Sequence, residues 1–169
     1  TIQSIFLINE KQIQAKYKYL SNSRLDYFQN FLETEEKITK EIDYVISSKA
    51  KVGIKYIKYL VQAGFKKNQE GQMMGIAPYK NLKTNLNKKV LEIANKAQQE
   101  TLDEVIELVE KAKEYSDCKN IILSGGYHLN CSNNFKLVKF YPEYNFFVDP
   151  IPYDGGTAIG SVYYYENYL

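Results

Sequence analysis

The run KNIILSGGYHLNC, residues 119–131, joins a short apolar segment to two adjacent glycines and then to a helical pattern. Its apolar part predicts a strand over 120–123, and the following pattern predicts a helix from about 130 to 140. A second apolar segment predicts a strand over 144–148, with another helix from about 157 onward. This βαβα order favours an α/β fold in which helices cover a parallel sheet.

The N-terminal half adds a predicted hairpin and a predicted insertion. Residues 2–8 and 13–19 read as two strands around a polar turn. The lysine- and glutamate-rich stretch 21–50 is predicted to be mostly helical, since apolar residues recur there at helical spacing. Those apolar residues are Phe28, Phe31, Leu32, Ile38, Ile42, Val45 and Ile46.

The central region contains two amphipathic patterns. Residues 52–63 predict a helix that ends at Gly64, because glycine adopts the left-handed backbone found after many helices. Residues 65–81 are interpreted as a loop, although their composition is too apolar for a simple linker. A long stripe of apolar residues predicts a helix over about 85–115.

Composition describes one ordinary domain. The chain has 169 residues, 44% hydrophobic residues and a net charge of +2. Arg24 is the only arginine, so neither the charge nor the residue types favour a nucleic-acid partner. No apolar segment approaches the length of a membrane span, and no zinc-binding spacing is present at Cys118 and Cys131. We expect a cytoplasmic protein with no membrane partner.

Two glycine pairs are the strongest indication of a binding site. Gly125-Gly126 and Gly155-Gly156 each follow a predicted strand and precede a predicted helix. Ligands of open α/β sheets bind at the carboxyl ends of the strands, so both turns should open onto one edge. Glycine permits a close backbone approach, and a helix N-terminus attracts phosphate. The pairs therefore favour a nucleotide or phosphate site, with tight strand-to-helix turns as the simpler alternative.

Three side chains near these turns have two interpretations each. Asp154 is placed to hold a metal ion that bridges phosphates, or to cap a helix or a turn. Asn130 is placed to cap the helix after it or to donate to a ligand. His128, the single histidine, is more simply explained as structural, because it has no partner for a catalytic triad or a metal cluster.

Three stretches together resemble one enzyme family. Residues 120–137, NIILSGGYHLNCSNNFKL, are similar to the family pattern l-x-GGVALNC-x-x-N-x-x-L. Residues 147–160, FVDPIPYDGGTAIG, are similar to PAAGDAGTALGA, and residues 64–79, GFKKNQEGQMMGIAPY, are similar to GF-x-x-x-EGKVMGLAPYG. The family is the nodulation and cephalosporin type of carbamoyltransferase (NodU/CmcH), and all three stretches occur in its order.

The resemblance implies an actin-like ATPase (RNase H-like) fold, here in part: a mixed sheet with covering helices. It implies transfer of a carbamoyl group through a carbamoyl-adenylate, made from ATP and carbamoyl phosphate, to a hydroxyl of a sugar or natural-product acceptor. It also implies a divalent metal, Fe or Mg. Together with the glycine pairs, it assigns nucleotide contacts to Glu70, Gly71, Gly125, Gly126, Asn130, Gly155 and Gly156, and metal binding to Asp154.

The sequence departs from the family pattern at several positions. Gln72 replaces a lysine, Tyr127-His128 replaces Val-Ala, and Tyr153 replaces the glycine before the acid. The family's HxxxH metal motif and its adenylate-forming domain have no counterpart here. We therefore expect residues 1–169 to form one incomplete domain, the C-terminal part of the catalytic domain, which is inactive by itself.

Two other functions are compatible with the same pattern. One is a non-catalytic nucleotide-binding or protein-assembly module that associates with itself or with a complementary chain. The other is a relative of the proteins that form threonylcarbamoyladenosine in tRNA. The EGQMMGIAPY stretch, residues 70–79, favours the carbamoyltransferase branch, and the low net charge offers tRNA little electrostatic attraction.

Overall fold

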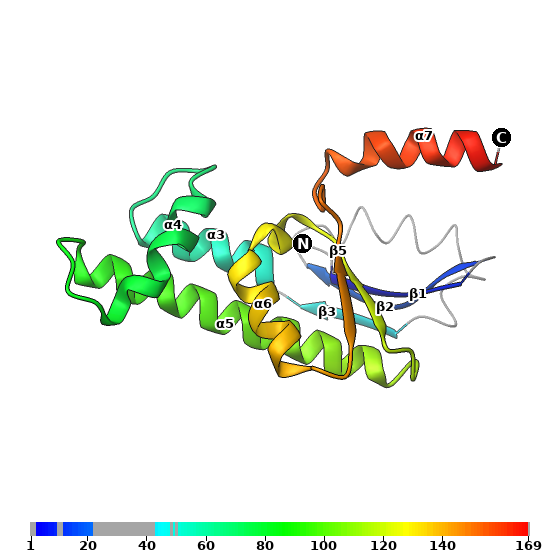
Figure 1. Ribbon diagram of the computed structural model, residues 1–169, viewed down its shortest axis with the longest axis horizontal. Helices are drawn as coiled ribbons and strands as arrows, with labels where there is room; N and C mark the ends of the chain where they lie inside the picture. Colours follow the sequence, from blue (N-terminus) through cyan, green and yellow to red (C-terminus); the bar gives the residue numbers. More distant parts are fainter. Residues whose placement is uncertain (1–2, 10–11, 22–42, 48, 50, 169) are drawn as a thin grey trace.

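The computed structural model describes residues 3–9, 12–21, 43–47, 49 and 51–168 (Figure 1). The chain combines two small sheets with helices, which makes the fold α/β. The elements are β1 Gln3–Ile8, β2 Ile13–Ser21, β3 Asp43–Ser47, α3 Val52–Gln62, α4 Glu70–Ile76, the 3-10 helix η2 Ala77–Asn81, α5 Lys88–Lys113, β4 Asn120–Leu123, the 3-10 helix η3 Gly126–Leu129, α6 Cys131–Phe140, β5 Asn145–Val148 and α7 Gly156–Tyr168.

The first sheet has the order β1-β2-β3. The predicted hairpin is confirmed, since β1 and β2 pair antiparallel. The helical prediction for 21–50 is wrong at β3, which pairs parallel to β2 with Asp43 opposite Tyr17. The open edge of β2 offers β3 backbone hydrogen bonds that local helical periodicity does not anticipate. The rest of that prediction, residues 22–42, lies outside the described residues.

Helix α3 ends as its sequence predicts. Gly64 has φ +85°, in the left-handed region that favours glycine. The N–H of Phe65 donates to the carbonyl of Leu60 at 3.1 Å, and the N–H of Gly64 donates to the carbonyl of Val61 at 3.0 Å. These two bonds form a Schellman motif, which satisfies carbonyls that the helix end would otherwise leave without partners.

The loop predicted over 65–81 is wrong from residue 70 onward, where the chain forms α4 and η2. Met73 is fully buried and Ala77 is 3% exposed, and both pack in one cluster with Leu60 of α3. A helix as short as α4 gains little stability alone. Its burial against α3 and α5 supplies the stabilisation, which explains the apolar composition noted in the sequence.

Helix α5 supports two separate clusters of buried side chains, and its length agrees with the prediction. The side chain of Asn87 caps its N-terminus by accepting from the N–H of Lys89 at 2.9 Å. Small residues in its first half, Ala94 and Ala97, pack with α3 and α4. The larger Leu102, Val105 and Val109 of its second half pack with β4 and α6.

The second sheet consists of β4 and β5, which pair parallel with Leu123 opposite Val148. Helix α6 makes the crossover between them and buries Leu137 in the same cluster as Leu123. The predicted βαβ unit is therefore confirmed. The single mixed sheet is not: over the described residues the strands form two sheets, because no register joins β4 or β5 to the first three strands.

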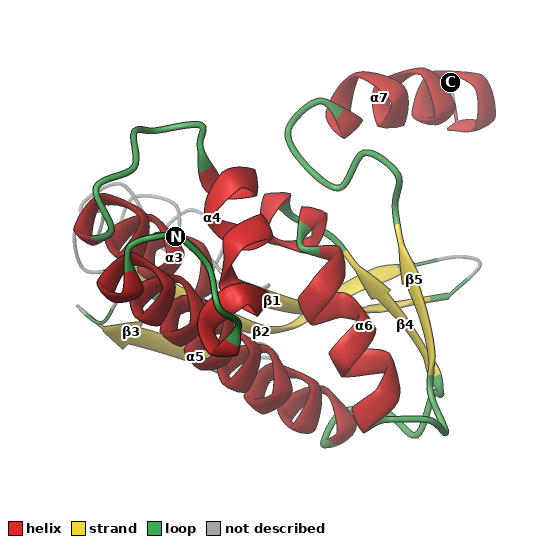
Figure 2. Cartoon of the chain, turned by 60° about the vertical axis from the view of Figure 1, so that its left-hand side comes forward, coloured by secondary structure: helices red, strands yellow, loops and turns green. Residues whose placement is uncertain are grey.

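Helix α7 follows β5 and lies apart from the rest of the molecule in Figures 1 and 2. It carries large exposed side chains, among them Val162 and Tyr165. The outer face of the second sheet is also exposed, with Ile122 at 58% and Phe147 at 56%. Parallel sheets are usually covered on both faces, whereas in the described structure the outer face of this sheet is uncovered.

The packing of α3 on α5 predicts that alanine substitutions at two neighbouring residues lower the free energy of unfolding by very different amounts. Leu60 is fully buried, whereas Val61 is 66% exposed on the same helix. We expect Leu60→Ala to lower the free energy of unfolding by about 3 kcal/mol, through lost burial and the cavity left behind. Val61→Ala should lower it by less than about 1 kcal/mol. Urea unfolding compares the variants, and equal losses would contradict this packing.

Candidate functional site

The two glycine turns lie side by side at the carboxyl edge of the β4–β5 sheet. Residues 124–126 follow β4 and residues 149–155 follow β5, whose strands are parallel and adjacent. A Cβ atom built on Gly126 would lie 3.7 Å from the Cβ of Tyr153. The turns therefore face a common space, as the sequence predicts from the strand order.

Each glycine has its own structural reason. Gly125 has φ +106°, which an L side chain rarely adopts. A Cβ on Gly156 would lie only 2.5 Å from the carbonyl oxygen of Ile151, so the chain's own packing requires glycine there. At Gly126 a Cβ would meet only ordinary van der Waals contact. The first turn thus leaves more room for a ligand to approach the backbone than the second.

Tyr153 fills part of the space between the two turns. A Cβ built on Gly155 would lie 2.8 Å from the Tyr153 ring, so this ring lies against one side of Gly155, which is still exposed. Half of the Tyr153 side chain is exposed. The resembling family has glycine at this position, and the structure shows what the larger side chain does: it narrows access to Gly155.

A buried polar network attaches the first turn to α5. The hydroxyl of Tyr127 donates to Oγ1 of Thr101 at 3.0 Å, and Thr101 Oγ1 donates to the carbonyl of Ala97 at 2.6 Å. The Nδ2 amide of Asn133 donates to the Tyr127 oxygen at 2.7 Å and to the carbonyl of Gln98 at 2.8 Å. Buried hydrogen bonds of this kind fix a loop in one position.

Asn130 belongs to the same network. Its Oδ1 accepts from the N–H of Asn133 at 3.3 Å, which makes it the N-cap of α6, and its Nδ2 donates to Oε1 of Gln98 at 2.6 Å. Only 1% of the residue is exposed. Of the two roles open from the sequence, the structure shows the capping role. A ligand contact of Asn130 stays a prediction.

Gln98, Thr101 and Asn133 were not among the site residues predicted from the sequence. Gln98 and Thr101 interrupt the apolar stripe of α5, and polar residues at such positions indicate a buried partner. Over the described residues, Nε2 of Gln98, Oδ1 of Asn133 and the hydroxyl of Tyr56 are buried without hydrogen-bond partners. The region behind the turn is therefore more polar than the sequence pattern indicates.

His128 lies in η3 and contacts this network from the side. Its Nδ1 lies 3.1 Å from Oδ1 of Asn134, whose Nδ2 donates to the His128 carbonyl at 2.7 Å. Burial lowers the pKa of His128 below its ordinary value, and the Asn134 contact opposes this shift in part. The neutral ring is favoured, which agrees with the structural interpretation of this residue.

Asp154 is exposed in the second turn. Its backbone carbonyl accepts from the N–H of Thr157 at 3.2 Å and from the Thr157 hydroxyl at 2.6 Å. Over the described residues no hydrogen bond or ion pair engages its carboxylate, which leaves that group open to solvent. Among the same residues no three His, Cys, Asp or Glu side chains gather to hold a metal. The described residues thus supply at most part of a metal site.

Glu70 and Gly71 lie in the first turn of α4. A carboxylate oxygen of Glu70 accepts from the N–H of Asn68 at 3.4 Å. The connection between α4 and the first turn is indirect, because Tyr56 packs in the same cluster as α4 and contacts Tyr127 edge to face at 6.5 Å between ring centroids. The structure does not bring Glu70 or Gly71 into contact with Gly125 or Gly126.

A comparison with protein families supports the assignment of this chain to a carbamoyltransferase family. Residues 87–163 match the family described as carbamoyltransferase N-terminus. This region runs from the cap of α5 into α7 and contains both glycine turns, whereas Glu70 and Gly71 lie outside it. No curated protein and no solved structure matches the chain. Over the described residues, no helix has the length and apolar composition needed to span a membrane.

The depressed pKa of His128 predicts a pH dependence of stability. The unfolded chain should titrate near the ordinary value of 6.5, and the folded chain below it. The contribution of neutral His128 is therefore complete above pH 6.5 and is lost as the pH falls through the folded pKa. As far as His128 contributes, we expect the free energy of unfolding, measured with urea, to be constant above pH 6.5 and to fall as the pH drops below that value.

His128→Gln is the matched control, because this variant contains no histidine. Its stability should fall less than that of the natural chain over the same pH range. Carboxylates titrate in both proteins and cancel in the comparison. Identical pH profiles would show that His128 titrates with the same pKa in the folded and unfolded states.

Proposed function

We propose that this chain is part of a carbamoyltransferase of the NodU/CmcH type, in an actin-like (RNase H-like) domain. The reaction transfers a carbamoyl group through a carbamoyl-adenylate, formed from ATP and carbamoyl phosphate, to a hydroxyl of a sugar or natural-product acceptor. The family match over 87–163 and the three resembling sequence stretches support this proposal.

The observation that carries the proposal is the adjacency of the two glycine turns at one sheet edge. Gly125 and Gly126 present exposed backbone, and a Cβ position on Gly126 lies 3.7 Å from the second turn. Backbone N–H groups at strand-to-helix turns are suited to phosphate oxygens, and a narrow space between two turns orients a bound group. Carbamoyl transfer demands such positioning more than a protein nucleophile.

The chain's own residues have separable roles in this proposal. The backbone at Gly125–Gly126 holds the phosphate of the nucleotide, and Tyr127, through Thr101 and Asn133, keeps that backbone in place. When bound, the adenylate supplies the activated carbamoyl group. Asp154 stays proposed as a ligand of Fe or Mg, together with ligands from outside the described residues.

A second candidate function is a non-catalytic assembly module. The exposed apolar side chains of the β4–β5 outer face and of α7 favour it, since soluble domains rarely leave such faces uncovered. Ile122, Phe147, Ile159, Val162 and Tyr165 are all at least 46% exposed. This function requires no nucleotide, so nucleotide binding distinguishes the two candidates.

The proposed nucleotide site predicts the effect of a side chain at Gly126. We expect the chain to bind ATP with Mg²⁺ in a calorimetric titration, and Gly126→Val to weaken this binding at least about tenfold, because the side chain enters the space between the turns. Gly75→Val is the matched control, since Gly75 lies in α4 with open space around its Cβ position. If the unmodified chain gives no binding, the assembly module is the better description.

Tyr153 provides a test in which a substitution should tighten ATP binding instead of weakening it. Because its ring lies against Gly155, Tyr153→Gly should widen the second turn and tighten ATP binding by about threefold or more. The same titration measures this effect, and Tyr79→Gly, at an exposed tyrosine of η2, is the control. Weaker binding in Tyr153→Gly would mean that the ring contacts the nucleotide instead of obstructing it.

A further inference from the structure

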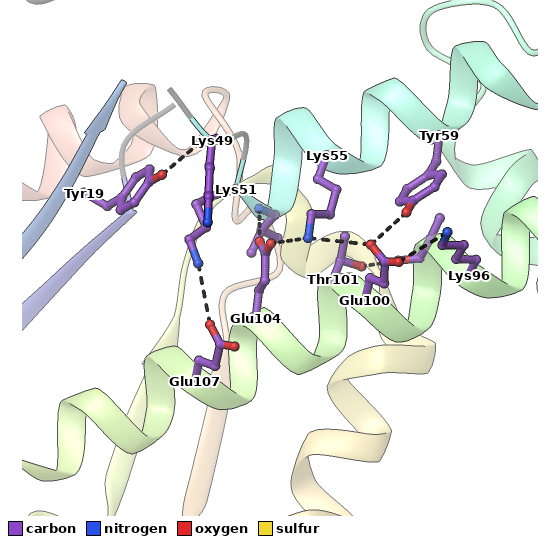
Figure 3. A network of polar contacts seen from close by, with 12 residues as sticks. Tyr19, Lys49, Lys51, Lys55, Tyr59, Lys96, Glu100, Thr101, Glu104 and Glu107 are labelled. Atoms are coloured by element: carbon purple, nitrogen blue, oxygen red, sulfur yellow. Dashed lines mark hydrogen bonds and ion pairs between the residues drawn. The ribbon is translucent and has the colours of Figure 1, made fainter. Parts of the chain in front are cut away.

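A hollow of about 440 Å³ lies on a different part of the molecule, beside the start of α3. Four lysines line it: Lys49, Lys51, Lys55 and Lys58. The acidic residue in its lining is Glu104 of α5, which lies opposite Lys55 in Figure 3. Four ammonium groups around one concave surface make the hollow strongly basic.

The single lining carboxylate is already engaged by the protein. Glu104 is 8% exposed, lies 2.5 Å from Nζ of Lys55, and accepts from the N–H of Val52 at 2.6 Å. The ion pair raises the pKa of Lys55 and keeps it charged. Glu104 therefore compensates Lys55 and the first N–H of α3, and Glu100 of α5, 3.6 Å from Nζ of the same lysine, adds a second carboxylate beside it.

The other lysines are weakly compensated. Lys51 pairs at 3.5 Å with Glu107, whose side chain is 70% exposed and well hydrated (Figure 3). Within the described part of the chain, no ion pair engages Lys49 or Lys58. The four lysines thus face three carboxylates, those of Glu100, Glu104 and Glu107, and the hollow keeps an excess of positive charge.

The position of these lysines near the N-terminus of α3 adds to the positive charge of the hollow. Helix N-termini carry a partial positive charge and favour acidic residues in the first turn. Helix α3 has no acidic residue there, and its N-cap is Lys51, without a side-chain cap. Solvent alone would accommodate scattered surface lysines, but here a concave surface gathers them along the first two turns of α3 and the residues just before it. A bound anion offsets both charges at once.

We propose that this hollow binds a compact small molecule that carries a phosphate group. Lysine is suited to this task as a flexible point charge that reaches phosphate oxygens. The volume lies in the range of small-molecule sites. Gln62 and Tyr59, which complete the lining, provide an amide and a half-buried aromatic ring for the part of the ligand that carries no charge.

This site is separate from the glycine turns and does not depend on the proposed function. Val52, Tyr56 and Leu60 form the buried face of α3, and Tyr56 contacts Tyr127 of the first turn. Lys55 and Lys58 lie on the remaining surface of this helix, and Lys49 and Lys51 lie just before it. The hollow and the turns are thus lined by different residues, so substitutions at the lysines leave the residues of the turns unchanged.

The probes are pyrophosphate and inorganic phosphate, titrated calorimetrically into the full chain at constant ionic strength set with sodium chloride. The experiment uses the Gly126→Val background, so that the glycine turns do not contribute. We expect saturable binding that Lys49→Gln with Lys58→Gln weakens at least about tenfold, because two charged donors are removed. Lys66→Gln with Lys67→Gln, at two exposed lysines outside the hollow, should change the affinity less than about twofold.

An independent measurement locates the site. In ¹H–¹⁵N spectra, phosphate should shift the backbone signals of Lys51, Lys58 and Gln62 and leave those of Gly125 and Gly126 unchanged. The proposal is overturned if the chain binds neither probe, if both double variants lose the same affinity, or if the shifts occur only at the glycine turns. Equal loss in the two double variants would identify non-specific attraction to net charge.

Discussion

The change of side-chain character halfway along α5 is the constraint on which the rest of the structure depends. Ala94 and Ala97 are small enough to let α3 and α4 approach closely, whereas Leu102 and Val105 fill the space under β4 and α6. Between the two apolar regions, Thr101 receives the hydroxyl of Tyr127. An apolar residue at position 101 would leave that hydroxyl without one of its partners in a buried site.

The position of the glycine turns follows from this support. Tyr127 is attached to α5, Asn130 caps α6 and contacts Gln98, and β4 and β5 are held parallel by the α6 crossover. Each turn then has its own local reason for glycine: a positive φ at Gly125, and a close carbonyl at Gly156. The turns are therefore shaped first by the protein's own packing, and the proposed nucleotide uses the space that this packing leaves.

Helix α3 separates two regions of different chemistry. Its buried face meets the tyrosine of the first turn, and its open face gathers lysines around a carboxylate that is already paired. Neutral amide and backbone groups dominate near the turns, whereas full positive charges dominate in the hollow. The two regions suit different ligands, since exposed backbone positions a phosphate at short range and lysines attract anions over longer distances.

The sequence by itself determined the features that depend on neighbouring residues. Gly64 predicted the end of α3, and the strand, glycine and helix order around Gly125 predicted a parallel βαβ unit with both turns at one edge. These features follow from backbone sterics and from the period of apolar residues, which act over a few positions.

Only the tertiary structure decided the features that depend on distant partners. Strand β3 forms on the edge of β2, α4 forms on the small residues of α5, and Asn133 finds the carbonyl of Gln98 across 35 positions of sequence. The close approach of the Tyr153 ring to Gly155 and the gathering of lysines beside Glu104 belong to the same group. Buried hydrogen bonds and side-chain packing are energetically decisive here, and neither is encoded in a local pattern.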